Sequence, residues 1–368
     1  MSLTFEIKAI CGKARLGELH TAHGVVRTPA FMPVGTGGTV KGLTPEMVDS
    51  TGADILLGNT YHLMLRPTAD RMQRLGGLHK FMQWDKPILT DSGGFQVMSL
   101  GSMCKIAENG VTFKSHLDGS KHFLSPAIAT NIQYKLDSNI TMVLDECTPY
   151  PVDHIRAESS MLRSMRWAVQ CRDAFIDRDG YGIFGIQQGS MFEDLRNHST
   201  EKLLAIDFDG YAIGGLAVGE GQEEMFRVLD FATIPLPHDK PRYLMGVGKP
   251  TDIIGAVMRG VDMFDCVLPT RAGRFGRAYT TQGELNLRNS RFADDDSPLD
   301  ESINCRASQF SKAYLHHLIK SGEMLGAIAL SWHNIAYYQH LMQEIRDAIA
   351  AQTLAKLASD LNIIYNKN

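Results

Sequence analysis

The stretch VDMFDCVLPTRAGR, residues 261–274, joins the features that decide the fold and the chemistry of this chain. Its first residues are apolar and predict a short buried strand. A carboxylate, Asp265, stands where the strand ends, and Pro269 predicts a loop carrying Arg271 and Arg274. Such an acid can attack or transfer protons while guanidinium groups hold phosphates. Taken alone, however, the segment favours an aspartate that caps a turn beside two solvated arginines.

Composition indicates a globular protein without a membrane segment. Of 368 residues, 44% are hydrophobic and 21% charged, which suits one large domain or two medium ones. No apolar run has the length of a membrane span and the first residues carry charges, so we expect a cytoplasmic protein. The six cysteines form no C-x-x-C pair and are expected to be reduced thiols. With a net charge of −4, a nucleic-acid partner would need a local basic patch.

An alternation of apolar runs and helical patterns predicts the fold class. The predicted strands are residues 28–34, 54–59, 87–92, 140–146, 181–189, 210–215, 242–248 and 263–267. The predicted helices between them are residues 44–50, 125–136, 154–176, 191–205, 220–231 and 250–259. Continuous apolar runs are typical of parallel strands buried on both faces, so we predict a (β/α)8 TIM barrel. An open doubly wound sheet is the second choice, because no G-x-G-x-x-G follows the first strand.

The chain changes character near residue 285. We assign residues 1–285 to the barrel and residues 286–368 to a C-terminal helical subdomain packed on it. Phe310, Tyr314 and His317 are expected on one helical face, where core packing or partner contact is the more common role.

Polar residues stand at successive predicted strand ends, where barrel enzymes build their sites. They are Asn59, Asp91, Asp145, Gln188, Gly215, Gly246 and Asp265. One aspartate at a strand end indicates a turn, but three aspartates and a glutamine from separate segments indicate a pocket. This convergence changes the interpretation of Asp265 from a turn residue to a candidate site residue.

Several segments resemble one family over nearly the whole chain. They are GTVKGLTPE, ILLGNTYHL, LTDSGGFQV, SHLDGSKH, DECTPYP, SMRWA, AIGGLAVGE, LMGVGKP and DCVLPTR. These segments resemble the bacterial tRNA-guanine transglycosylases, also called queuine tRNA-ribosyltransferases. The resemblance implies a homodimer in queuosine biosynthesis that exchanges guanine at the wobble position of GUN anticodons for a 7-deazaguanine base.

The resemblance also implies roles for particular residues. Asp265 looks like the nucleophile and Asp91 like the acid/base group. The implied base-binding residues are Asp91, Ser92, Gly93, Gly94, Phe95, Asp145, Gln188 and Gly215. The implied tRNA-contacting residues are Gly246, Val247, Gly248, Lys249, Pro250, Thr251, Asp252, Thr270, Arg271, Ala272, Gly273 and Arg274. The chemistry suits these residue types, because a carboxylate can trap the oxocarbenium-like state at an anomeric carbon.

The chain departs from the family at the expected zinc site. The alignment places the family's ligands at Ser302, Asn304, Ala307 and His333, of which only His333 is a ligand type. Zinc requires four nitrogen or sulfur ligands, so we predict no structural zinc and no cofactor. A shifted site that uses Cys305 and His333 remains an alternative.

A second departure concerns the loop after Asp265. Ala272 and Phe275 stand where the family usually has Asn and either His or Asn, so nucleic-acid readout is open here. An active tRNA enzyme that takes guanine or the aminomethyl precursor preQ1 is the first hypothesis, because Cys147 and Val218 resemble the bacterial pocket. A paralogue acting on DNA or another RNA, and a non-catalytic tRNA-binding subunit, are the alternatives.

Overall fold

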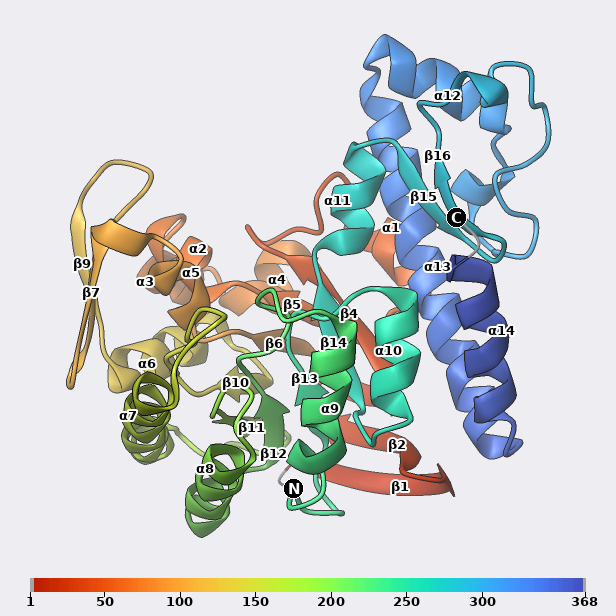
Figure 1. Cartoon of the computed structure of the whole chain (residues 1–368). Coiled ribbons are helices and arrows are strands. Elements are labelled where there is room, and N and C mark those ends of the chain that lie inside the picture. The colour runs from red at the N-terminus through yellow and green to blue at the C-terminus, as the bar shows by residue number, and fades with distance from the viewer. Residues whose placement is uncertain (1–2, 367–368) are drawn as a thin grey trace.

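The computed structural model describes residues 3–366 and contains a closed barrel of eight parallel strands (Figure 1). In barrel order these are β4 (Ala30–Gly35), β5 (Leu56–Gly58), β6 (Ile88–Thr90), β10 (Ile140–Met142), β11 (Gly182–Gln187), β12 (Gly210–Ile213), β13 (Arg242–Leu244) and β14 (Met263–Cys266). Pairing of β14 with β4 closes the barrel. All eight predicted strands are confirmed, because each lies inside a continuous apolar run.

Helices follow the strands as predicted and establish the (β/α)8 class. The predicted ones are α1 (Pro45–Asp49), α6 (Pro126–Leu136), α7 (His154–Ala174), α8 (Glu193–Ile206), α9 (Gln222–Ala232) and α10 (Pro250–Val257). Local sequence explains where two of them begin. The Ser125 hydroxyl and the Asp153 carboxylate accept hydrogen bonds from backbone N–H groups of the first turns of α6 and α7.

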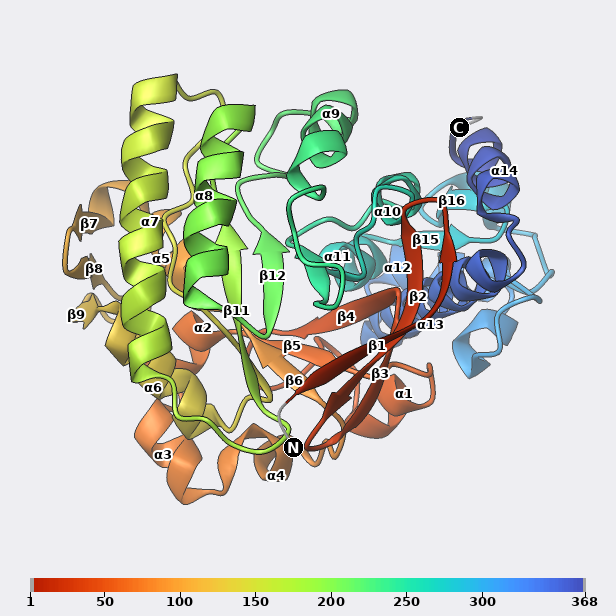
Figure 2. The same cartoon turned by 90° about the horizontal axis from the view of Figure 1, so that it is seen from below.

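Two three-stranded antiparallel sheets were not predicted. β1 (Thr4–Cys11), β2 (Ala14–Thr21) and β3 (Gly24–Thr28) form one, and β7 (Cys104–Ala107), β8 (Gly110–Lys114) and β9 (Lys121–Leu124) form the other. The first sheet lies against the amino ends of the barrel strands, since Ala22 N–H donates to Gly180 O just before β11 (Figure 2). The burial of β1 alternates residue by residue, so a search for period two could have found it.

Short helices were also missed. They are α2 (Thr60–Leu65), α3 (Ala69–Arg74), α4 (Gly77–Met82), α5 (Gly94–Met98) and the 3₁₀ turn η1 (Gly101–Met103). None of them reaches two full turns, so the sequence contains too little of the helical period to indicate them. They matter because α2 and α5 begin directly after the strand ends that hold Asn59 and Asp91.

The predicted loop after Asp265 is wrong, because residues Leu268–Arg274 form helix α11. Pro269 lies in the first turn, where its missing N–H has no helical partner in any case and its fixed φ suits the helix. Arg271 and Arg274 therefore occupy the last turn, and both are exposed. The two arginines therefore belong to a helix that follows directly after strand β14.

The C-terminal region is helical after a short hairpin. Its elements are β15 (Arg277–Thr280), β16 (Gly283–Asn286), η2 (Ser290–Phe292), η3 (Arg306–Gln309), α12 (Lys312–Ser321), α13 (Met324–Ala350) and α14 (Leu354–Asn366). The expected helical face is only partly correct, because Phe310 precedes α12 while Tyr314 and His317 lie on it. Within residues 3–366, no helix combines the length and apolarity that a bilayer crossing needs.

Helix α13 braces the mouth of the barrel from the side opposite the β7–β9 sheet (Figure 1). Asn334 Nδ2 donates to Pro269 O at 2.9 Å, and Tyr338 OH donates to Gly248 O. The fit against α11 is close, since a Cβ on Gly273 would lie 2.6 Å from Ser331 N. The C-terminal region thus fixes both segments that the sequence predicts to contact RNA.

Candidate active site

A cavity of about 550 Å³ opens at the carboxyl ends of the barrel strands. Its wall includes nine residues predicted from the sequence: Asp91, Ser92, Gly93, Phe95, Asp145, Gly215, Gly246, Asp265 and Arg271. Asn59, another predicted strand-end residue, lines it too. The predicted convergence of separate strand ends on one pocket is therefore confirmed.

Asp91 follows β6 and is held by the start of α2. Thr60 N–H donates to its Oδ1 at 2.8 Å, Gly93 N–H donates to the same oxygen, and Asn59 Nδ2 donates to Oδ2. Burial raises the pKa of Asp91 to about 7, and the charge of Asp265 adds to this effect against the hydrogen bonds. A carboxyl group with this pKa can either give or take a proton at neutral pH.

Asp265 lies in β14 with its two oxygens in different environments. Oδ1 accepts hydrogen bonds from Tyr243 OH at 2.6 Å and from Gly246 N–H at 2.8 Å. No donor within residues 3–366 forms a hydrogen bond with Oδ2. Burial raises the pKa of Asp265, while the Tyr243 hydroxyl and the Gly246 N–H lower it. The two donors fix the carboxylate and leave Oδ2 available for a substrate.

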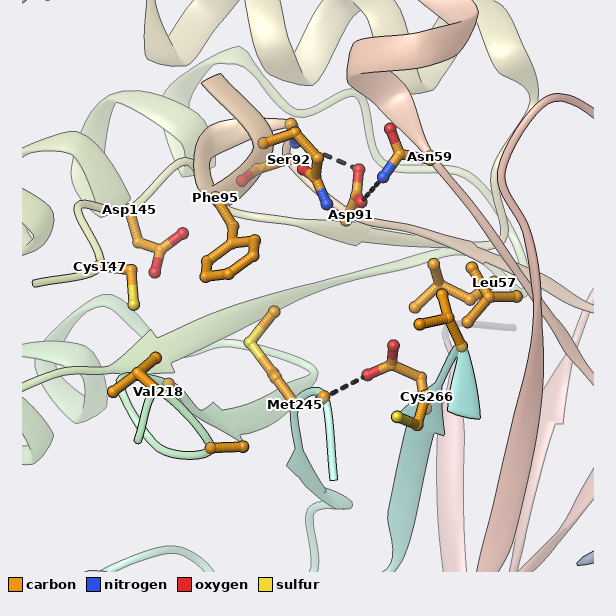
Figure 3. Close-up of a pocket in the computed structure, with 18 of the residues that line it drawn as sticks. Leu57, Asn59, Asp91, Ser92, Phe95, Asp145, Cys147, Val218, Met245 and Cys266 are labelled. Carbon is orange, nitrogen blue, oxygen red and sulfur yellow. Dashed lines mark hydrogen bonds between the residues drawn. The ribbon is translucent and has the colours of Figure 1, made fainter. Parts of the chain in front are cut away.

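Asp145 stands at the other end of the cavity with Cys147 (Figure 3). Gln188 Nε2 donates to Asp145 Oδ2 at 2.6 Å. Burial raises the pKa of Asp145 to about 6, and the hydrogen bond from Gln188 opposes this shift. Gln188 is 2% exposed and lies behind Asp145, outside the cavity wall.

Phe95 and Met245 stand between these two ends (Figure 3). The Phe95 ring is 56% exposed although it is aromatic, and Met245 lies across the cavity from it. An exposed aromatic ring inside a polar cavity is suited to stacking on a flat ligand. The cavity therefore offers a slot with acceptors at one end and a free carboxylate oxygen at the other.

The loop after β12 forms another wall and depends on a residue that the sequence did not indicate. The Glu220 carboxylate accepts hydrogen bonds from Ala217 N–H at 2.5 Å and Val218 N–H at 2.9 Å. Ala217 has φ of 58°, a left-handed conformation that costs energy for a residue with a Cβ. The carboxylate stabilises this turn, so the loop has a defined shape without ligand.

The predicted RNA-contacting residues divide by exposure. Gly246, Lys249, Arg271 and Arg274 are exposed, and Thr251 and Asp252 are partly exposed. Val247, Gly248, Pro250, Thr270, Ala272 and Gly273 are buried. Ala272 is 6% exposed whereas Phe275 is 61% exposed, so of the two departures only Phe275 presents a side chain to solvent. Gly94 is buried too, behind the cavity wall.

The residues around His333 do not fit the zinc ion that the family resemblance implies. His333 is fully buried, with Nδ1 hydrogen-bonded to Ser308 Oγ and Nε2 to Tyr279 O, both at 2.8 Å. Among residues 3–366, neither His333 nor Cys305 belongs to a group of three possible metal ligands. With both ring nitrogens bonded and no thiolate set, the donor atoms that zinc requires are missing.

Another group of possible ligands, His23, His79 and Asp137, is arranged for packing. The two imidazole rings stack with centroids 3.7 Å apart and planes 10° apart. Lone pairs of imidazole lie in the ring plane, so parallel rings do not direct them at one point. Asn139 also bonds one nitrogen of each ring, His23 Nδ1 at 2.8 Å and His79 Nε2 at 3.1 Å.

A closed parallel barrel with three aspartates in one cavity defines a (β/α)8-barrel protein with a carboxylate site at its mouth. A family model described as queuine tRNA-ribosyltransferase matches residues 11–366. The chain is 61% identical to the queuine tRNA-ribosyltransferase of Zymomonas mobilis over 367 residues, which cover 98% of this chain and 95% of that protein. A relative of the same description from Granulibacter bethesdensis is 61% identical over 99% of this chain and 97% of its own length. One from Rickettsia rickettsii is 63% identical over 91% of this chain and 93% of its length.

The chain belongs to the queuine tRNA-ribosyltransferase family. This finding confirms the resemblance of the sequence motifs, and the match extends through the C-terminal helices as well as the barrel.

Proposed function

We propose that the protein is a tRNA-guanine transglycosylase that exchanges guanine at the wobble position of GUN tRNAs for a 7-deazaguanine base. The proposal rests on the arrangement of the Asp265 carboxylate in a chain of this family. Two donors hold Oδ1 of Asp265, and Oδ2 is left open to a substrate. An oriented carboxylate at an anomeric carbon can form a covalent ribosyl ester, and a second displacement restores the original configuration.

In the first step Oδ2 of Asp265 attacks C1′ of the ribose while the bond from C1′ to N9 of guanine breaks. Asp91 gives a proton to N9, so guanine leaves as a neutral base. In the second step Asp91 takes the corresponding proton from the incoming base, whose nitrogen then displaces Asp265 from C1′. Protons and charges balance over the two steps, and Asp91 ends as it began.

The charge of Asp265 couples these two roles of Asp91. A charged Asp265 contributes to the raised pKa of Asp91, so a large share of the free enzyme carries a proton on Asp91 at neutral pH when it meets tRNA. Ester formation removes the charge of Asp265. The pKa of Asp91 then falls, which favours its action as a base towards the incoming purine. The order of proton transfer thus follows from the order of bond formation.

At the far end of the cavity, Asp145 would accept hydrogen bonds from the N1–H and 2-amino group of the base. The Gly215 N–H would donate to the 6-oxygen, and Phe95 would stack on the ring. Gln188 supports Asp145 in the present arrangement through the bond at 2.6 Å. Cys147 and Val218 line the end of the slot, which favours the aminomethyl base preQ1 over the larger queuine.

The exposed cations Lys249, Arg271 and Arg274 are suited to hold the anticodon-loop phosphates. A single-stranded loop can turn its base outward at low cost, which lets the base enter the barrel mouth. We propose a cytoplasmic homodimer in which Tyr314, exposed on α12, contributes to the subunit contact. Ultracentrifugation would test the dimer, and a monomer at assay concentrations would contradict it.

We further propose that the C-terminal subdomain, residues 286–368, folds without zinc. The Ser308–His333–Tyr279 hydrogen bonds and the Asp300 carboxylate would stabilise it instead. Asp300 accepts hydrogen bonds from Thr281 N–H at 2.7 Å and Ser302 N–H at 3.0 Å. These contacts satisfy the turn that the family's zinc would otherwise organise.

Incorporation of labelled guanine into a GUN tRNA tests the proposed function directly. We expect incorporation with the wild-type chain and a covalent adduct with tRNA that survives denaturation. Absence of exchange by folded protein would refute the activity. A DNA substrate and a tRNA with another anticodon serve as controls, because exchange on either at equal rate would favour the paralogue alternative. Binding of tRNA by folded protein, with neither exchange nor a covalent adduct, would favour a binding subunit.

A further inference from the structure

Arg196 is a fully buried arginine beside the base slot, and the proposed mechanism assigns it no role. It lies in α8 with 0% exposure. Its Nε donates to Ser190 O at 2.9 Å, Nη1 donates to Gln187 O at 3.3 Å and to Gln187 Oε1 at 3.2 Å, and Nη2 donates to Gly214 O at 2.8 Å. The guanidinium therefore ties the end of β11 to the end of β12.

All four acceptors of Arg196 are neutral oxygens. Within residues 3–366, no carboxylate forms an ion pair with it. Burial lowers the pKa of Arg196 to about 10, which still leaves a cation at neutral pH. Desolvation of an unpaired cation is unfavourable, and an apolar side chain at this position would avoid that cost. The position therefore suggests that the cation does something that packing alone would not.

The geometry of a trans peptide supplies that function. In the Gly214–Gly215 unit, the C=O of Gly214 and the N–H of Gly215 belong to one planar group and point in opposite directions. Arg196 holds the C=O from behind the cavity, so the N–H must point forward. The Gly215 N–H does face the Cys147 thiol in the cavity wall, where it opposes the raising of the Cys147 pKa by burial to about 12.

We infer that Arg196 is a positioning residue that aims and polarises the Gly215 N–H towards the 6-oxygen of the base. A charged donor on one end of a peptide strengthens the donor at the other end, because hydrogen bonds in a chain polarise one another. The inference rests on the proposed function and adds the origin of its selectivity for a 6-oxo purine.

Two further contacts keep the peptide in this orientation. Glu220 holds the other end of the loop through Ala217 N–H and Val218 N–H. Gly214 N–H donates to Gln187 O at 3.0 Å, an oxygen that Arg196 also contacts. A Cβ on Gly215 would lie 2.8 Å from Gln188 Oε1 and would be strained at φ of 66°, so glycine is favoured at this position. The loop is thus held by a cation at one end and a carboxylate at the other.

The test compares guanine with 6-thioguanine, which differs in carrying the poorer acceptor sulfur at position 6. The preference of each variant is the ratio of its affinities for the two bases. Both affinities are measured at saturating tRNA in the exchange of labelled guanine, with 6-thioguanine added as the competitor. In Arg196→Met we expect this preference to fall about tenfold, with the KM for tRNA changed less than about twofold. In Arg196→Lys, which keeps a cation, we expect a smaller fall of about threefold.

Arg242 provides the matched control. It is 8% exposed, and its Nη2 also donates to a backbone carbonyl, that of Leu236 at 2.8 Å, but at the opposite end of the barrel strand. Arg242→Met should lower the midpoint of thermal unfolding and leave the base preference unchanged. An unchanged preference in folded Arg196→Met and Arg196→Lys would overturn the inference, as would an equal fall in Arg242→Met. Wild-type protein that incorporates no guanine would instead refute the proposed function.

Discussion

Two buried polar clusters of this chain are built on opposite rules. At the barrel mouth, Asp91, Asp145 and Asp265 share a cavity, and Asp265 keeps one oxygen without a donor from residues 3–366. In the C-terminal region, both ring nitrogens of His333 are bonded, to Ser308 and Tyr279. The second cluster is closed in hydrogen bonds, as stable interiors require. The first keeps acceptors and raised pKa values for a ligand, which is typical of functional sites.

The largest expected effect separates the open carboxylate from a closed one three residues away. Asp265→Asn should lower guanine exchange by at least about 10⁴-fold, because an amide oxygen is a poor nucleophile. Asp262 is fully buried with Arg15 Nε at 3.0 Å, so Asp262→Asn should reduce stability and spare the chemistry of folded protein. Exchange rates and thermal unfolding of both variants check this contrast. Equal rates for the two variants would remove the distinction between the open carboxylate of Asp265 and the closed one of Asp262.

Tyr243→Phe tests the fixed oxygen of the same residue. The variant loses the donor to Asp265 Oδ1 at 2.6 Å, and we expect kcat to fall by about 10- to 100-fold. The Tyr243 hydroxyl lowers the pKa of Asp265, so its removal should also move the acidic limb of the rate profile to higher pH. A rate profile that keeps its position would show that the hydroxyl acts on packing alone.

The two clusters should respond to acid in opposite directions. Asp91 has a pKa of about 7 in the folded protein and about 4 in the unfolded chain. Proton binding at Asp91 therefore stabilises the folded protein at low pH, and this contribution to the free energy of unfolding is lost as pH rises towards 7. Burial lowers the pKa of His333 to about 4 from an unfolded value of about 6.5. The folded state therefore binds fewer protons there, and its contribution is lost as pH falls below about 6.5.

Variants with neutral side chains check these signs. Asp91→Asn should reduce the fall of stability as pH rises between about 4 and 7. His333→Gln should reduce the loss of stability as pH falls below about 6.5. Denaturant unfolding measured across this range gives both slopes. The same slope change in both variants would contradict the assignment. Guanine exchange itself should decline below about pH 6, where Asp145 takes up its proton.

The smallest effect concerns the closed cluster. Ser308→Ala removes the hydroxyl that bonds His333 Nδ1 and should cost about 1–2 kcal/mol of unfolding free energy. Dialysis against a chelator should leave both exchange and unfolding of the wild-type chain unchanged. A drop in either after chelation, restored by added zinc, would show that the region needs a metal ion.

The contrast between these regions also explains what the sequence could indicate. The eight barrel strands were predictable because each lies in a continuous apolar run, and Asp91, Asp145 and Asp265 were predictable because they follow such runs. Helix α11 was not, because Pro269 indicates a break wherever it occurs and the sequence does not say whether it starts a helix. Ala272 is buried in α11, and the packing of α11 on α13 joins distant parts of the chain, so its burial left no local signal.

Supporting residues escaped prediction for a different reason. Arg196 bonds neutral carbonyls, so no acidic partner marks it, and it occupies a helix where arginine is common. Tyr243 reads as one more apolar residue of its strand until its hydroxyl is seen at Asp265. Glu220 has the place of an ordinary helix-start carboxylate, although its partners are the N–H groups of the preceding loop. Such roles depend on which atoms meet, and the residue types alone do not encode them.

Helix α13 gives the molecule a mechanical property that neither cluster has alone. It contacts Pro269 and Gly248 near the cavity and, through Arg346 Nη1 at 2.8 Å, Pro29 O just before β4. One rod thus spans from the rim to the base of the barrel. A force applied at α11 would be transmitted through α13 to the barrel strands. A fragment that ends before α13 would lose these contacts, so the barrel and the C-terminal helical region must be engineered as one piece.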